Sequence, residues 1–77
     1  MKSAYSLIIQ WSDEDEVYIA KLPEFGSALT HGSSYEEAAR MGQELLETLI
    51  DIYVADGKPL PEPDRFIYEK ARVPASV

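Results

Sequence analysis

The chain has 77 residues, 45% of them hydrophobic and none of them cysteine, so we expect one globular domain without a disulfide or a thiolate nucleophile. Fourteen acidic against seven basic residues give a formal net charge of -7, which would repel phosphate backbones and anionic lipids and argues against direct nucleic-acid or membrane binding. The N-terminus shows no leader pattern, and no apolar run approaches the roughly 18 residues of a membrane span, so we expect a cytoplasmic location.

Three short strands are predicted in the first part of the chain. Residues 5–11 are rich in aromatic and β-branched side chains and are followed by a polar stretch at residues 12–15 that is typical of a turn. A second strand is predicted over residues 17–22, where Pro23 ends it, and a third near residues 28–31. Together they predict an antiparallel meander.

The loop between the first two strands decides which side chains share a face of the sheet. A five-residue loop would place Lys21 opposite Leu7 on the apolar face, where the amine would lose its hydration without gaining a partner. We therefore favour a four-residue turn with Trp11 opposite Glu16. This register gathers on one face Tyr5, Leu7, Ile9, Tyr18, Ala20 and Leu22. It leaves on the other face an apolar patch of the kind that marks an interface, formed by Ile8, Val17 and Ile19.

A long amphipathic helix is predicted over residues 35–56. Ser34 and Glu37 have the spacing of a capping box, in which each side chain accepts the backbone N–H of the other residue. Gly57 suits the left-handed C-terminal cap, and Pro59 prevents continuation of the helix. The apolar arc is wider than the usual stripe of about 100°, which indicates a second contact surface beside the sheet. The residues that we assign to self-association are Ile8, Val17, Ile19, Ile52 and Val54.

The proline-rich residues 58–63 predict an extended connector, and residues 65–69 could form a short fourth strand. The predicted fold class is therefore α+β, in the order β-β-β-α-β, with the helix packed on one face of the meander. We expect a domain over residues 1–63 and a C-terminal strand or flexible tail over residues 64–77.

Four segments, in this order, carry a resemblance to a known family: Ile-Gln-Trp-Ser-Asp-Glu-Asp (9–15), Leu-Pro-Glu-Phe (22–25), Thr-His-Gly-Ser-Ser-Tyr-Glu-Glu-Ala (30–38) and Gly-Lys-Pro-Leu-Pro-Glu-Pro (57–63). The series resembles the HicB antitoxins and their short solitary relatives. The resemblance implies a partial ribonuclease H-like fold whose last strand runs beside the first. Many members carry a DNA-binding segment after this domain, and residues 64–77 are too few to hold one, so we do not expect the chain alone to regulate an operon.

The resemblance also implies a partner, the HicA-type toxin, a small RNA-cleaving protein with a basic surface. An acidic antitoxin of a type II toxin-antitoxin system could neutralise it by covering that surface. The candidate partner-binding residues are Asp13, Glu14, Asp15, Glu16 and Glu24. We expect a homodimer or tetramer. The alternative is a solitary homo-oligomeric structural or regulatory protein without a toxin partner.

Catalysis and cofactor binding are not expected. A ribonuclease H-like enzyme would carry a carboxylate in its first strand, and residues 5–11 contain none. Four consecutive acids at residues 13–16 should fan outward and not converge on a metal ion. His31, the only histidine, is expected to be a hydrogen-bonded side chain near a turn, and Trp11 and the tyrosines are expected to pack in the core or at an interface.

Overall fold

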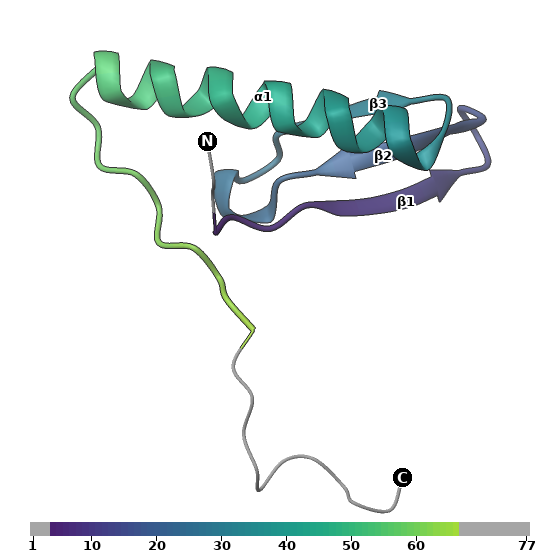
Figure 1. The fold of residues 1–77 in the computed structure, drawn as a ribbon, viewed down its shortest axis with the longest axis horizontal. Coiled ribbons are helices and arrows are strands. Elements are labelled where there is room, and N and C mark those ends of the chain that lie inside the picture. The colour runs from purple at the N-terminus through teal and green to yellow at the C-terminus, as the bar shows by residue number, and fades with distance from the viewer. Residues whose placement is uncertain (1–3, 67–77) are drawn as a thin grey trace, which may run out of the picture.

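The strands and the helix form two layers. The structure, a computed structural model, describes residues 4–66. It contains β1 (Ile8–Ser12), β2 (Val17–Lys21), the short 3-10 helix η1 (Pro23–Phe25), β3 (Leu29–Gly32) and α1 (Tyr35–Ala55). The strands form one antiparallel sheet in the order β1-β2-β3, and α1 lies across one of its faces (Figure 1). The predicted α+β class, with a three-stranded meander and one long helix, is confirmed.

The β1–β2 hairpin has a four-residue loop as predicted, but the loop is residues 13–16 and not 12–15. Ser12 pairs with Val17 and Trp11 pairs with Tyr18, so the predicted pairing of Trp11 with Glu16 is wrong. The carbonyl of Ser12 accepts the N–H of Glu16 at 2.7 Å, which closes the turn one residue later. Each residue of β1 pairs two positions further along β2 than predicted. Because side chains alternate between the faces with a period of two, the predicted faces are still correct.

The face of the sheet under α1 holds the small core. Ala20 and Leu22 of the β2 segment and Ala38 of the helix are fully or almost fully buried. Gly42 lets the helix approach, because a Cβ atom there would lie 2.5 Å from Leu7 Cδ1 and 3.3 Å from Ala20 Cβ. The first half of the helix therefore lies close against the sheet.

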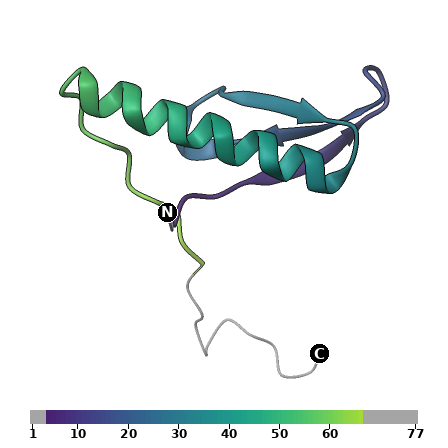
Figure 2. The same cartoon turned by 45° about the horizontal axis from the view of Figure 1, so that its top comes forward.

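The opposite face of the sheet, which we call the open face, is not covered by another element of residues 4–66 (Figure 2). Side chains alternate along a strand, so the burial of Ala20 under the helix turns Val17, Ile19 and Lys21 to the open face. Ile8 joins them because it pairs with Lys21. The prediction that Ile8, Val17 and Ile19 share a face is confirmed. β3 adds Leu29, which is 53% exposed.

Both ends of α1 are capped by the predicted residues. Ser34 Oγ accepts the N–H of Glu37 at 3.0 Å, but the Glu37 carboxylate accepts from the backbone N–H and the hydroxyl of Ser33 and not from the N–H of Ser34. The Ser34 half of the capping box is therefore present, whereas Glu37 bonds to Ser33, one residue before the predicted partner. At the other end Gly57 is left-handed (φ 69°), and the N–H of Lys58 bonds to the carbonyl of Tyr53 at 2.9 Å, as in a Schellman motif.

After α1 the chain runs without a regular element through residue 66 and returns toward the start of β1. The hydroxyl of Tyr5 donates to the carbonyl of Pro61 at 2.7 Å. Of the expected fourth strand, Arg65 and Phe66 belong to no strand, and the rest lies outside the described residues. α1 is the only α-helix of residues 4–66, and it is not apolar enough to cross a membrane.

Candidate binding surfaces

The acidic turn, Asp13, Glu14, Asp15 and Glu16, forms the exposed tip of the first hairpin. Two of its carboxylates accept hydrogen bonds from the side chains of the preceding residues, Trp11 and Ser12. Trp11 Nε1–H donates to Asp13 Oδ1 at 2.7 Å, and Ser12 Oγ donates to Asp15 Oδ2 at 3.2 Å. The N–H of Asp15 in turn donates to Ser12 Oγ at 3.2 Å. The backbone and two carboxylates of the turn are therefore fixed before any partner binds.

No basic side chain of residues 4–66 forms an ion pair with the acidic turn. Within residues 4–66, ion pairs involve Arg40 alone, which lies 3.7 Å from Glu37 and 3.4 Å from Glu44 along the helix. Lys21 stands at the far end of β2, where it pairs with Ile8. Four carboxylates on one tight loop without a neighbouring cation create a local negative potential that attracts a basic surface.

An aromatic cluster of Trp11, Tyr18 and Tyr35 lies beside the acidic turn. The ring centroids of Trp11 and Tyr18 are 5.0 Å apart, and those of Tyr18 and Tyr35 are 4.4 Å apart. The sequence did not predict this grouping, because the preferred register placed Glu16 opposite Trp11. A pairing of Ser12 with Val17 would have brought Trp11 and Tyr18 together.

Glu24, the fifth candidate partner-binding residue, is used inside the fold. Its carboxylate accepts the N–H and the hydroxyl of Ser6 at 3.1 and 2.9 Å and the N–H of Asp64 at 2.8 Å. Partial burial acts to raise the pKa of Glu24, but the hydrogen bonds from Asp64 and Ser6 outweigh it and hold the pKa below its ordinary value. Glu24 thus joins the start of β1, η1 and the segment after the helix.

The five candidate self-association residues lie on two separate surfaces. Ile8, Val17 and Ile19 belong to the open face, and Ile8 is 40% exposed. Ile52 and Val54, 47% and 64% exposed, lie in the last turn of α1, which reaches beyond the sheet (Figure 1). The structure does not bring the two sets together within one chain.

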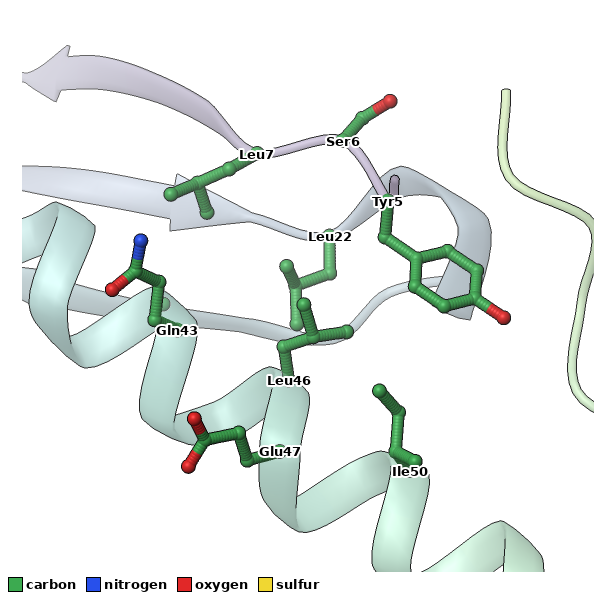
Figure 3. Close-up of a pocket in the computed structure, with 9 residues that line it drawn as sticks. Tyr5, Ser6, Leu7, Leu22, Gln43, Leu46, Glu47 and Ile50 are labelled. Carbon is green, nitrogen blue, oxygen red and sulfur yellow. The ribbon is translucent and has the colours of Figure 1, made fainter. Parts of the chain in front are cut away.

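A groove of about 270 Å³ lies between the segment before β1 and the middle of α1. Figure 3 shows Leu46 and Ile50 of the helix reaching toward Leu22 and Tyr5 across it. Gln43 and Glu47 are the polar side chains that the helix adds to its rim. Polar and apolar atoms contribute about equally to the lining, and the residues described bring no cluster of reactive side chains together in the groove.

His31 lies on β3 opposite Ile19 and is exposed on the open face. Its side chain takes part in no hydrogen bond with the part of the chain that the structure describes, so the expectation of a hydrogen-bonded histidine near a turn is not met there. In the same part no three acidic or histidine side chains converge as metal ligands. The groups with distinctive chemistry are therefore the acidic turn and the aromatic cluster.

Fold and surfaces together define a small α+β domain with a charged, preorganised loop suited to binding. No family model and no solved structure matches the chain. Among curated proteins it is similar to Antitoxin HicB 2 of Photorhabdus laumondii subsp. laumondii, with 30% identity over 69 residues. This match covers 90% of the present chain and 50% of the relative, so the chain spans about half the length of the protein it matches. Over this shared domain the match supports a relationship of the chain to the HicB-like antitoxin family.

Proposed function

We propose that the chain is an antitoxin that neutralises a basic, RNA-cleaving HicA-type toxin by covering it. Its relative's role as an antitoxin supports this, and the observation that carries the proposal is the uncompensated acidic turn. In this proposal the protein acts in the cytoplasm by binding, without catalysis, a cofactor or direct contact to nucleic acid.

The acidic turn suits this role for two physical reasons. Opposite potentials accelerate the encounter with a basic partner and favour the correct orientation. Carboxylates that are already fixed, such as Asp13 by Trp11 and Asp15 by Ser12, lose less conformational entropy when they meet a cation. A loop of this kind could occupy the positions that RNA phosphates take on the toxin.

Glu24 was expected to touch the partner as well. Its oxygens already accept hydrogen bonds from Ser6 and Asp64, and a partner cation would have to share them. The proposed contact therefore rests on the acidic turn, while Glu24 joins segments of the fold at the other end of the β1–β2 hairpin.

Co-expression tests the antitoxin proposal directly. The chain would be expressed with the small basic HicA-type protein encoded nearest to its gene, and growth and co-purification would be followed. We expect the chain to relieve growth arrest and to co-purify with the toxin. Persistent arrest without co-purification would contradict the proposal, and a stable homo-oligomer in that case would favour the solitary structural or regulatory role.

We also propose that the protein forms a homodimer or tetramer. Three fully or almost fully buried hydrophobic residues, two of them alanine, make a small core for residues 4–66. The open face carries apolar side chains that no layer covers, and pairing of two such faces would bury them. Ile52 and Val54 are exposed on the last turn of α1 but point about 200° apart around the helix, so either one could add the second contact that a tetramer needs in addition to a dimer contact.

A further inference from the structure

The aromatic cluster combines rings in mutual contact with solvent access. Tyr18 lies between the other two rings, at an interplanar angle of 65° to Trp11 and 35° to Tyr35. The outer residues remain open, since Trp11 is 51% and Tyr35 is 62% exposed. Burial of large aromatic side chains stabilises a fold, so a cluster of them that stays exposed often marks a surface that binds a ligand or a partner protein.

The electrostatic surroundings select a cation. The indole N–H of Trp11 is bound to Asp13, which fixes a carboxylate at the edge of the cluster. Glu36 and Glu37 in the first turn of α1 offset the positive end of the helix dipole there. Ring faces attract cations, most strongly for tryptophan, and the attraction grows when carboxylates stand beside the ring.

The same chain already contains a contact of this type elsewhere. Lys58 Nζ lies 4.8 Å from the centroid of the Tyr53 ring at the other end of α1. Within residues 4–66 no cation occupies the corresponding position at Trp11, Tyr18 or Tyr35. The cluster is therefore suited to a cation that residues 4–66 do not supply.

We propose that Trp11, Tyr18 and Tyr35, with the acidic turn beside them, form a receptor for an arginine side chain of the basic partner. This inference rests on the proposed function and names the chemistry of its contact. Arginine fits better than lysine, because its planar guanidinium stacks on aromatic rings while its N–H groups bind a carboxylate such as Asp13. A stacked nucleotide fits less well, since its phosphate would meet four carboxylates.

Trp11 is the only tryptophan, so its fluorescence reports on the site in the intact protein. The probe is a tetra-arginine peptide at low ionic strength, compared with tetra-lysine and with uncharged tetra-citrulline. We expect saturable quenching by tetra-arginine, clearly weaker binding of tetra-lysine and none of tetra-citrulline. Equal binding of tetra-lysine and tetra-arginine would overturn the assignment to arginine.

Two substitutions at exposed Tyr35 separate ring chemistry from simple charge attraction. Tyr35→Phe keeps the ring and should leave the affinity for tetra-arginine within about two-fold, whereas Tyr35→Leu keeps apolar area and should weaken it about five-fold. Circular dichroism confirms that both variants fold. Unchanged binding by Tyr35→Leu, or no binding by the wild type, would overturn the receptor. Neither result touches the antitoxin proposal, which the growth test decides.

Discussion

The carboxylate of Glu24 accepts the backbone N–H of Asp64 at 2.8 Å, which joins two residues that are 40 positions apart in the sequence. The same carboxylate holds Ser6 at the beginning of the β1 segment. One side chain in η1 therefore connects the N-terminal segment to the chain that follows α1. The hydrogen bonds of the domain thus extend one residue past the expected boundary at residue 63.

Replacement of Glu24 by glutamine should destabilise the protein by about 1–2 kcal/mol at neutral pH, because an amide cannot accept all of these hydrogen bonds. The pKa of Glu24 is lowered in the folded protein. Its contribution is therefore complete above the ordinary glutamate value of about 4.3 and is lost as the pH falls through the lower folded value. Urea denaturation of both proteins should show a difference at pH 7 that shrinks toward pH 3.

Glu47→Gln is the matched control, since Glu47 is exposed on α1 and accepts no hydrogen bond from the described residues. It should leave stability nearly unchanged at both pH values. A pH-independent difference between the wild type and Glu24→Gln would show that the Glu24 interaction is not carried by the ionised carboxylate.

Gly42→Ala should destabilise the protein by about 1–3 kcal/mol, although alanine is the better helix former by about 1 kcal/mol. The added Cβ would lie 2.5 Å from Leu7 Cδ1 and 3.3 Å from Ala20 Cβ, so the Leu7 side chain would have to leave its packing position and the contact with Ala20 would tighten. Thermal denaturation followed by circular dichroism measures the effect. Shortening the opposing side chain in Leu7→Ala/Gly42→Ala should make the alanine less costly than it is alone, and a more stable Gly42→Ala protein would contradict the packing described.

Ser34→Ala should cost about 1 kcal/mol, because its hydroxyl oxygen accepts the N–H of Glu37 at the start of α1. Ser27→Ala, at an exposed turn, is the control and should have little effect. Chemical denaturation of the two variants gives the comparison. Equal stabilities would mean that water replaces the cap without loss.

Val17→Asp should prevent self-association through the open face, since each copy would carry a carboxylate into the apolar contact. Val54→Asp tests the other surface, on the last turn of α1. Light scattering at high protein concentration should show monomers for Val17→Asp if the protein is a dimer through the open face, and dimers for either variant if a tetramer uses both surfaces. A monomeric wild type would refute the proposed oligomer altogether.

The sequence predicted the elements well where local patterns determine them. The ends of α1 follow from Ser34 and from Gly57 with Pro59, whose backbone effects act within a turn. The two faces of the sheet follow from alternation, and they survived an error in pairing because that error moved each partner by an even number of residues.

What the sequence could not predict depends on contacts between distant segments or on one hydrogen bond. The loop closes at Glu16 because Ser12 accepts its N–H, a choice that alternation of side chains does not determine. Glu24 looked like a surface acid, and its role depends on Ser6 and Asp64, which lie 18 and 40 residues away. The aromatic cluster depends on the same hairpin pairing and on where α1 begins.

The affinity of the chain for its HicA-type toxin, measured by calorimetry with the acidic turn neutralised, tests the central claim most directly. The variant Asp13→Asn/Glu14→Gln/Asp15→Asn/Glu16→Gln is compared with Glu44→Gln/Glu47→Gln/Asp51→Asn/Asp56→Asn, which removes the same charge from the middle and the C-terminal end of α1. We predict that the turn variant binds at least about ten-fold more weakly than the helix variant, with less dependence on salt. Equal affinities for the two variants would contradict the account.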